Sequence, residues 1–409
     1  MNILFLSLTS YDTLSKHNIY TDLLREFKKD GHKIYAVCPV QRRTKMPTRL
    51  IEEDGAAILQ VRTGNITKAN LIEKGLSTMM IGRQFIRAIK KHFGGVTFDL
   101  ILYPTPPITL VSVVKYFKNK DHAKTYLMLK DIFPQNAVDI GMMSKSGVKG
   151  MLYKRFRRQE KELYEVSDRI GCMSQANCDY VLQHNPEVDP SKVEICPNAV
   201  EVVDMRITAA ERAEIREKYG IPNDRKVFVY GGNLGRPQGI PFLLDCLKAQ
   251  AEKKNGAYFL IVGSGTEYGK LQAWFDGAKP ENMKLMNRLP KEDYDKMVAG
   301  CDVGMVFLDH RFTIPNFPSR ILSYMQAGLP ILACTDPNTD VGRVITEGGF
   351  GWWCESNDAE AFSRTVEAAV SADCAAAGEK AYDYLCTNFT ADKVYSVIME
   401  SCAFDGERA

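Results

Sequence analysis

The second half of the chain contains a glycine-rich segment, Tyr230–Gly239, that reads YGGNLGRPQG and joins an apolar run to a helical pattern. Glycines let the backbone approach a ligand closely, the amides at a helix start attract anions, and Arg236 offers a guanidinium to phosphate oxygens. The segment therefore predicts a phosphate site, and a tight turn with an exposed arginine is the alternative. The candidate ligand-binding residues are Gly232, Asn233, Gly235, Arg236 and Gln238.

A second glycine segment, Phe259–Gly269, also leads from an apolar run into a helical pattern. A dinucleotide-binding loop has the pattern G-x-G-x-x-G, but position 268 is tyrosine and the third glycine comes one residue late, at Gly269. This imperfect motif ranks a nicotinamide-dependent oxidoreductase last among the candidate functions. It favours a strand-to-helix turn near a nucleotide, formed by Gly263, Gly265 and Thr266.

A third segment follows the apolar run Val303–Leu308 and has a helix start at Pro318 and Ser319, in a helix that is expected to reach Gly328. The first amides of this helix, with Arg320 beside them, are expected to face a diphosphate. The alternative is that Ser319 caps the helix and Arg320 lies in a solvated turn. The candidates are Asn316, Phe317, Pro318, Ser319, Arg320 and Ser323, and Arg288, after the apolar run Met283–Met286, is assigned to the same ligand.

In the first half of the chain, Asp131 follows the apolar run Thr125–Leu129. A carboxylate at the end of a strand can orient or deprotonate a substrate hydroxyl, and capping of the next helix is the alternative. His17 is a second candidate for a polar contact, although a lone histidine at a helix start is more often structural. Asp131 and His17 are the two candidate catalytic residues.

Charge is unevenly distributed along the chain. Residues 1–200 carry 30 Lys+Arg and 20 Asp+Glu, whereas residues 201–409 carry 23 Lys+Arg and 30 Asp+Glu. The overall net charge of +3 does not predict nucleic-acid binding. The basic excess is densest from Lys145 to Lys161, where apolar side chains are interleaved, and such a helix can lie on an anionic membrane surface. An apolar strip at positions 149, 152, 153 and 156, packed inward, is the alternative. The candidate membrane or acceptor contacts are Lys149, Lys154, Arg155, Arg157 and Arg158.

The composition excludes several classes of protein. A chain that is 45% hydrophobic and 25% charged is ordinary for a globular protein, and no run approaches the ~20 apolar residues that cross a bilayer. Eleven cysteines without a Cys-x-x-Cys pair favour reduced thiols in a cytosol. Asp293 and Asp295 fall in a helical pattern, Pro290–Ala299, and the six histidines show no helix-spaced pair, so we expect no metal site.

Short apolar runs alternate with helical patterns along the whole chain, which predicts parallel sheets covered by helices on both faces. Pro197 and Asn198 interrupt this pattern before an acidic helix that begins near Thr208. We predict an α/β protein of two doubly wound domains, 1–197 and 198–389, with a terminal helical segment at 390–409. The expected strands are Ile3–Leu8, Ile34–Cys38, Ala57–Val61, Leu100–Tyr103, Thr125–Leu129, Val227–Tyr230, Tyr258–Val262, Met283–Met286, Val303–Leu308 and Ile331–Cys334.

The order and spacing of these segments resemble the GT-B glycosyltransferases of the large retaining family four, in particular the type that builds bacterial capsules, exopolysaccharides and O-antigens. The resemblance implies two Rossmann-like domains facing across a cleft, an N-terminal one for the acceptor and a C-terminal one for the nucleotide-sugar, with the terminal helix returning to the N-terminal domain. It also implies metal-independent chemistry, in which helix-end amides, Arg236 and Arg320 stabilise the leaving diphosphate. It rests on Met1–Cys38, Lys130–Pro134, Cys196–Val200, Gly231–Gly239, Val262–Tyr268 and Phe317–Pro330.

The chain departs from the family pattern at four positions. Asn233 and Gln238 stand where the common phosphate loop has arginine and lysine, so Arg236 is the remaining cation of that loop. The family's two glutamates, which have seven residues between them, correspond to Pro315 and Ser323 here. Contacts to the ribose and to the transferred sugar must therefore be made differently, or not at all.

We therefore expect a hexosyltransferase-type glycosyltransferase that moves a sugar from a nucleotide-sugar, expected to be a UDP-sugar, to a lipid-linked saccharide during surface polysaccharide synthesis. It would work in the cytoplasm, at the surface of the inner membrane, without a cofactor or a nucleic-acid partner. Two alternatives remain open: a catalytically silent GT-B scaffold that binds a nucleotide-sugar or a partner enzyme, and a nucleotide-sugar epimerase of the same architecture.

Overall fold

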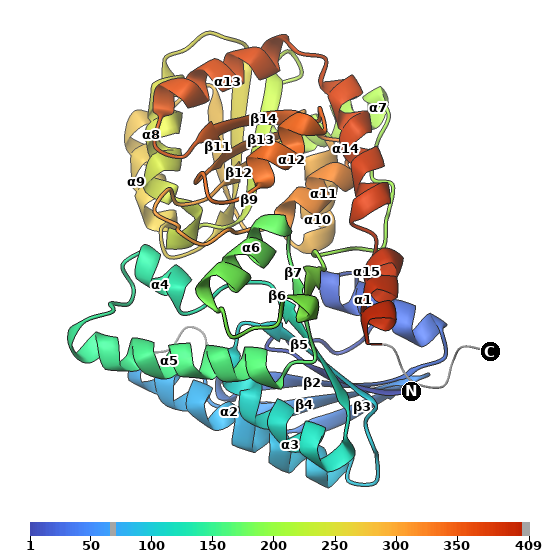
Figure 1. Cartoon of the computed structure of the whole chain (residues 1–409). Helices are drawn as coiled ribbons and strands as arrows, with labels where there is room; N and C mark the ends of the chain where they lie inside the picture. Colours follow the sequence, from blue (N-terminus) through green and yellow to red (C-terminus); the bar gives the residue numbers. More distant parts are fainter. Residues whose placement is uncertain (66–70, 403–409) are drawn as a thin grey trace. The chain divides into compact units, whose positions relative to one another are not determined.

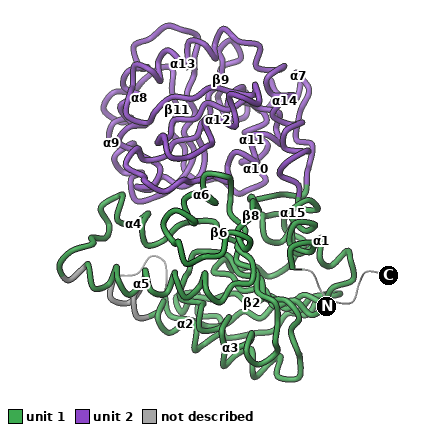
Figure 2. Tube along the Cα trace, in the orientation of Figure 1, with its two compact units in different colours: residues 1–201, 391–409 green, residues 202–390 purple. Residues whose placement is uncertain are grey.

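A computed structural model describes residues 1–65 and 71–402 of the chain, except for the side chains of residues 71–76 and 148–149. The chain forms two compact units (Figure 2). Unit 1 contains Met1–Glu201 together with the segment that begins at Ala391, and unit 2 contains Val202–Thr390. The chain thus leaves unit 1 after Glu201 and re-enters it for its last helix.

Unit 1 is built on an eight-stranded sheet with the order β3-β4-β2-β1-β5-β6-β7-β8. All neighbouring strands are parallel except for the edge strand β3, which runs antiparallel to β4. The inner strands are buried on both faces, which explains why they appear in the sequence as continuous apolar runs. The strands are β1 (Asn2–Leu6), β2 (Lys33–Gln41), β3 (Arg49–Glu53), β4 (Ala56–Thr63), β5 (Leu100–Thr105), β6 (Lys124–Leu129), β7 (Arg169–Cys172) and β8 (Val193–Ile195).

Helices cover the sheet of unit 1 (Figure 1). The chain's last helix, α15, packs on α1, where the ring of Tyr395 meets that of Phe27 edge-on at 4.8 Å. Val394 and Ile398 of α15 are buried in the same core as β1 and β2. The helices of unit 1 are α1 (Ile19–Lys29), α2 (Leu71–His92), α3 (Val111–Asp121), α4 (Gln135–Asp139), α5 (Gly147–Val166), α6 (Gln175–His184) and α15 (Ala391–Ser401).

Unit 2 has a six-stranded, wholly parallel sheet with the order β11-β10-β9-β12-β13-β14. The strands are β9 (Lys226–Asn233), β10 (Ala257–Ser264), β11 (Met283–Asn287), β12 (Val303–Phe307), β13 (Ile331–Thr335) and β14 (Gly351–Glu355). The helices are α7 (Ala209–Tyr219), α8 (Ile240–Ala251), α9 (Tyr268–Ala278), α10 (Lys291–Ala299), α11 (Arg320–Gln326), α12 (Val341–Glu347), α13 (Ala359–Ser371) and α14 (Cys374–Asn388). The predicted class, two doubly wound α/β domains, is confirmed.

Candidate functional site

The order of the strands in unit 2 reverses between β9 and β12. From β9 the chain builds outward through β10 to β11, and then returns to place β12 on the opposite side of β9. The loops that leave β9 and β12 therefore diverge, and ligands bind at the carboxyl ends of the strands at such a reversal. The first predicted glycine segment leaves β9 at this point.

A pocket of about 440 Å³ opens beside the ends of β9 and β10. Four of the predicted donor residues line it, namely Gly232, Asn233, Gly263 and Arg288. Among the described residues no hydrogen bond or ion pair engages Arg288, so its guanidinium is available to an anion. The complete lining is Gly232, Asn233, Val262, Gly263, Ser264, Arg288, Leu289, Lys291 and Tyr294.

Lys291 and Tyr294 are pocket residues that the sequence analysis did not identify. Both lie on α10, the helix that the sequence predicts as an amphipathic element with a solvated charged face. Lys291 is paired with Asp295 at 2.6 Å, which accounts for part of that charge pattern. Lys291 and Tyr294 could have been identified because α10 directly follows β11, and the end of β11 lies beside the end of β10.

Close backbone packing explains the glycines of both segments. A Cβ atom on Gly231 would lie 1.8 Å from the Tyr294 hydroxyl oxygen, and one on Gly263 would lie 2.1 Å from the Gly232 carbonyl oxygen. The Leu234 amide donates to the Ser264 carbonyl at 3.0 Å, which joins the two segments. Gly263 and Gly265 thus serve a tight loop-to-loop contact, and α9 begins only at Tyr268.

Arg320 supports the β9 loop from inside unit 2. Its guanidinium donates to the Gly231 carbonyl at 3.1 Å and to the Gln238 side-chain oxygen at 2.5 Å, and it lies over the Tyr230 ring at 4.6 Å. Arg320 is therefore not in a solvated turn, and Gln238 is occupied by it. These contacts use donors on both terminal nitrogens of the guanidinium, so Arg320 holds the β9 loop in place. Direct binding of a diphosphate by Arg320 stays a prediction.

Arg236 is the exposed cation of the same loop. Its side chain is 57% exposed and its Nε lies 3.8 Å from Glu267. Glu267 is buried at the start of α9 and is bound more closely by Lys270, at 2.5 Å. A contact of 3.8 Å is longer than a good charge-assisted hydrogen bond, so the Arg236 guanidinium can turn to an anionic ligand.

The segment after β12 differs from the expectation. The helix α11 begins at Arg320 and ends at Gln326, so it is shorter than the predicted helix, and Ser319 makes no capping hydrogen bond. Phe317 is 8% exposed and its ring packs 5.7 Å from Phe389, which makes it a core residue. None of the following predicted residues lines the pocket: Gly235, Arg236, Gln238, Gly265, Thr266, Asn316, Phe317, Pro318, Ser319, Arg320 and Ser323.

In unit 1, Asp131 is a buried carboxyl group just beyond the end of β6. Its Oδ2 accepts from the Asn136 side chain at 2.7 Å, whereas Oδ1 is buried without a partner in the described residues. Burial raises the pKa of Asp131 from 3.8 to about 6. The next helix, α4, has no side-chain cap, so the capping alternative is wrong. A carboxyl with this pKa can exchange a proton near neutral pH.

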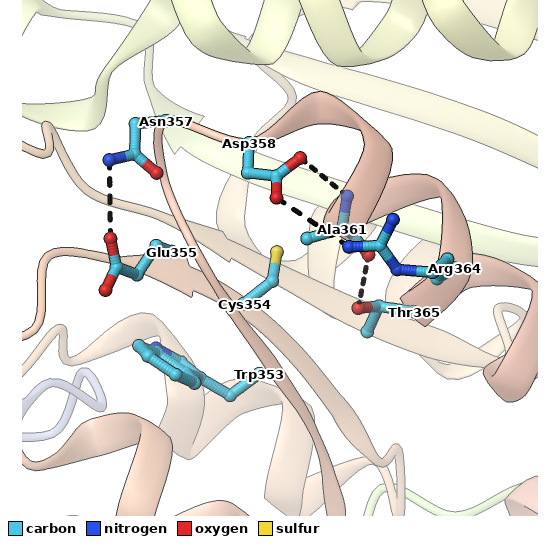
Figure 3. Close-up of a pocket in the computed structure, with 8 residues that line it drawn as sticks. All are labelled: Trp353, Cys354, Glu355, Asn357, Asp358, Ala361, Arg364 and Thr365. Atoms are coloured by element: carbon cyan, nitrogen blue, oxygen red, sulfur yellow. Dashed lines mark hydrogen bonds and ion pairs between the residues drawn. The ribbon is translucent and has the colours of Figure 1, made fainter.

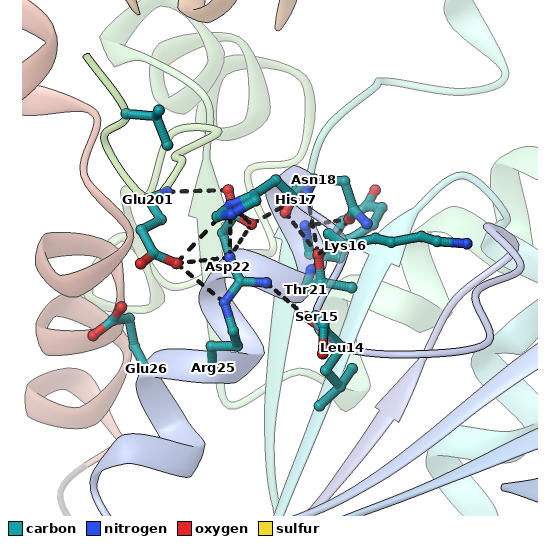
Figure 4. A network of polar contacts seen from close by, with 12 residues as sticks. Leu14, Ser15, Lys16, His17, Asn18, Thr21, Asp22, Arg25, Glu26 and Glu201 are labelled. Carbon is teal, nitrogen blue, oxygen red and sulfur yellow. Dashed lines mark hydrogen bonds and ion pairs between the residues drawn. The ribbon is translucent and has the colours of Figure 1, made fainter. Parts of the chain in front are cut away.

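His17 belongs to a polar network at the start of α1 (Figure 4). Arg25 donates to His17 Nδ1 at 2.9 Å, and it also contacts Asp22 at 2.6 Å and Glu201 at 2.7 Å. The backbone amide of Glu201 donates to the buried Asp22 at 3.0 Å. The network thus holds the last residue of this part of unit 1 against α1, and the geometry favours the structural interpretation of His17.

The basic helix α5 carries the predicted membrane contacts. Lys154, Arg155 and Arg158 are exposed, and the neighbouring Met151 and Leu152 are 67% and 46% exposed. The inward-packed strip is therefore wrong for Leu152. Arg157 is bound to Glu160 at 3.0 Å and to the His184 carbonyl at 3.1 Å, and the Lys149 side chain lies outside the described residues. In the described part of the chain, no helix combines the length and apolarity that crossing a membrane requires.

Comparison with known proteins extends these observations. Residues 211–384 match the family model described as glycosyl transferases group 1. WbjE of Pseudomonas aeruginosa, named as a glycosyltransferase, is 26% identical over 314 residues, which are 76% of this chain and 75% of that protein. WcaI of Escherichia coli K12, named as a colanic acid biosynthesis glycosyl transferase, is 21% identical over 252 residues and 60% of each chain. The crystal structure of HepE from Anabaena has a TM-score of 0.71 at 14% identity, and the match covers 98% of this chain and 99% of that one.

The matched region includes every residue that lines the pocket. The structural neighbours also support the GT-B architecture that the resemblance implied. Unit 2 therefore carries a glycosyl transferases group 1 domain, and the chain is a transferase with glycosyltransferase relatives in bacteria.

Proposed function

We propose that the chain is a retaining GT-B glycosyltransferase of family four that transfers a sugar from a UDP-sugar to a lipid-linked saccharide in surface polysaccharide synthesis. The observation that carries the proposal is the pocket at the ends of β9 and β10, because it lies within the glycosyl transferases group 1 match and presents an unengaged Arg288. The HepE structure was determined in complex with UDP and glucose, which supports UDP as the nucleotide.

In this proposal unit 2 binds the donor diphosphate. The backbone amides of Gly232 and Asn233 and the guanidinium of Arg288 offer positive charge to the phosphate oxygens from the pocket lining. Arg236 is on the same loop but outside that lining, and its exposed side chain would turn toward the phosphates. These groups would stabilise the negative charge that develops on the leaving nucleoside diphosphate, without a protein-bound metal. Arg320 acts indirectly, because it fixes the Gly231 carbonyl and therefore the shape of the loop.

Unit 1 supplies the acceptor side of the reaction. Asp131 would accept a hydrogen bond from the acceptor hydroxyl through Oδ1, the oxygen that lacks a protein partner in the described residues. Exposed basic and apolar side chains on α5 would bring a lipid-linked acceptor to the enzyme at an anionic membrane surface. The name of WcaI, which refers to colanic acid biosynthesis, supports a polysaccharide product.

The decisive experiment measures donor use and nucleotide binding with the purified full chain. UDP, GDP, CMP and ADP are compared by thermal shift, and UDP is expected to give the largest stabilisation. UDP-sugars are then incubated with and without lipid-linked saccharides, and the products are separated. Binding without any turnover would support a silent scaffold, whereas conversion of the donor sugar in the absence of an acceptor would support an epimerase.

Replacing Arg236 with alanine is expected to weaken UDP binding by roughly 1.5–3 kcal/mol, because a charge-assisted hydrogen bond to phosphate is lost. This corresponds to a rise in Kd of roughly 10- to 150-fold, which isothermal titration calorimetry can measure. Arg343→Ala is the matched control, since Arg343 lies on α12 and its side chain is 58% exposed, against 57% for Arg236. Equal Kd values for the two variants would remove Arg236 from the donor site.

Neutralising α5 is expected to release the protein from anionic membranes. The triple variant Lys154→Gln, Arg155→Gln, Arg158→Gln should lose about 1 kcal/mol of membrane-binding free energy for each charge removed. Binding to phosphatidylglycerol vesicles should therefore fall on the order of 100-fold in a flotation assay. The control replaces the exposed Lys248, Lys254 and Lys270 of unit 2 with glutamine and should bind like the unmodified chain. Equal loss in both triple variants would indicate attraction by overall charge and not by α5.

A further inference from the structure

Unit 2 contains a pair of cysteines that the proposed transfer reaction does not use. Cys334 of β13 and Cys354 of β14 are directly paired in the parallel register, so their side chains leave the same face of the sheet. Their sulfur atoms lie 3.5 Å apart. All eleven cysteines are free thiols in the structure. Cys172 and Cys178 of unit 1 also form a thiol contact, but they are fully or almost fully buried and line neither pocket described here.

The spacing of the two strands suits a disulfide. Adjacent strands are about 4.8 Å apart, and disulfides join Cα atoms that are roughly 4.4–6.8 Å apart. The sulfurs would need to approach by only about 1.5 Å to reach a bond length of about 2.05 Å, a movement that side-chain rotation can supply. Covalent pairing is therefore compatible with the native sheet.

The two thiols differ in whether they reach a pocket. Both are buried, Cys334 fully and Cys354 to 5% exposure, but Cys354 lines a second pocket of about 420 Å³ between the end of β14 and α13. Figure 3 shows the Cys354 sulfur on the side of β14 that faces Ala361, Arg364 and Thr365 of α13. A small oxidant can enter this pocket and meet Cys354 first.

The surroundings also activate Cys354. Contact with the Cys334 thiol lowers the pKa of the Cys354 thiol, and Thr365 and Arg364 act in the same direction. Burial raises the pKa of Cys334, which keeps this second thiol protonated. A reactive thiol beside a resolving thiol is the arrangement of redox-sensitive cysteines.

We propose that Cys334 and Cys354 form a peroxide-responsive dithiol, in which Cys354 is attacked first and Cys334 resolves it. The Cys354 thiolate attacks one oxygen of hydrogen peroxide, which breaks the O–O bond and gives a sulfenic acid and, after protonation, water. The Cys334 sulfur then displaces the hydroxyl group as a second water and forms the S–S bond. In sum, two thiols lose two electrons and two protons, and one peroxide becomes two waters.

The test treats the full chain with hydrogen peroxide, blocks the remaining thiols and maps the peptides by mass spectrometry without reduction. The expected result is a linked pair of peptides containing Cys334 and Cys354, lighter by two hydrogen atoms than the sum of the two and separated again by dithiothreitol. Cys386→Ser, which removes the exposed cysteine of α14, is the matched control and should leave the link unchanged.

A second variant tests the order of events. In Cys334→Ala no resolving thiol is present, so Cys354 should advance to the sulfinic acid, with a gain of two oxygen atoms. The proposal is overturned if peroxide oxidises Cys386 while Cys354 stays reduced, or if Cys354 is linked to another thiol of the same core, such as Cys246. Because the first readout uses the unmodified chain, a folding defect in a variant does not obscure the result.

Discussion

Asp131→Asn is expected to lower the rate of sugar transfer by roughly 10²- to 10⁴-fold, the usual contribution of a positioned general base. The amide has nearly the same shape as the carboxyl group and can still accept from the Asn136 side chain, which now bonds Oδ2 at 2.7 Å. It cannot take a proton from an acceptor hydroxyl. Initial rates at saturating donor measure the effect, and the thermal shift with UDP should be unchanged because Asp131 lies in unit 1.

The pH dependence gives this prediction a second readout. Burial raises the pKa of Asp131 to about 6, so the rate should rise with pH through about pH 6 and then level, and the variant should lose this limb. The stability of the folded state should change in the opposite direction to the rate as the pH rises. The native state holds this proton more tightly than the unfolded chain, so stability falls as the pH rises from about 4 to about 6.

Asp131→Asn has no carboxylate to bury, so its stability does not fall as the pH rises from about 4 to about 6. At pH 7 it should melt at a higher temperature than the unmodified chain, and below pH 4 the difference should vanish. Asp179→Asn, at an exposed position of α6, is the control and should alter neither the rate nor the melting profile. An unaltered transfer rate in Asp131→Asn would exclude Asp131 from the chemical step.

Gly231→Ala is expected to abolish donor binding with a single methyl group. The new Cβ would lie 1.8 Å from the Tyr294 hydroxyl oxygen and 2.3 Å from the ring carbon that carries it. Tyr294 lines the pocket, so either its ring or the end of β9 must move. Overpacking of this kind costs about 1–3 kcal/mol of stability, and the displaced loop can no longer present its amides to a diphosphate.

Thermal melts with and without UDP separate the two effects of Gly231→Ala. The unliganded melting temperature should fall, and the UDP-dependent shift should disappear. Adding Tyr294→Ala to this variant creates room for the methyl group and should restore most of the stability. A UDP-dependent shift of normal size in Gly231→Ala would mean that the β9 loop does not contact the donor.

Sequence patterns predicted most of the inner strands, because strands that are buried on both faces appear as unbroken apolar runs. The short inner strand β7 and the edge strands β3, β8 and β14 were missed. β3 reads RLIEE and is half exposed, whereas β14 begins at Gly351, a residue that suggests a turn. That glycine is needed because a Cβ there would lie 2.0 Å from the Ile331 carbonyl oxygen of β13. Such a contact between strands cannot be seen in a local pattern.

In the candidate donor site, too, local sequence predicted some residues, whereas the roles set by contacts between distant segments could not be predicted. Gly232, Gly263 and the cation Arg288 could be selected because each follows an apolar run in the sequence. The role of Arg320 could not, since its partners Gly231 and Gln238 are more than 80 residues away in the chain. Which residues line a pocket depends on strand order, and strand order is settled by packing between distant segments.

The return of α15 to unit 1 has a consequence for biosynthesis. The first 201 residues leave the ribosome well before Val394 and Ile398, which fill the core beside β1 and β2. Until those side chains arrive, the nascent unit exposes the apolar patch that they later cover. Unit 2 is contiguous in the chain and can complete its core before α15 is synthesised, so we expect the amino-terminal unit to be the last to complete its core.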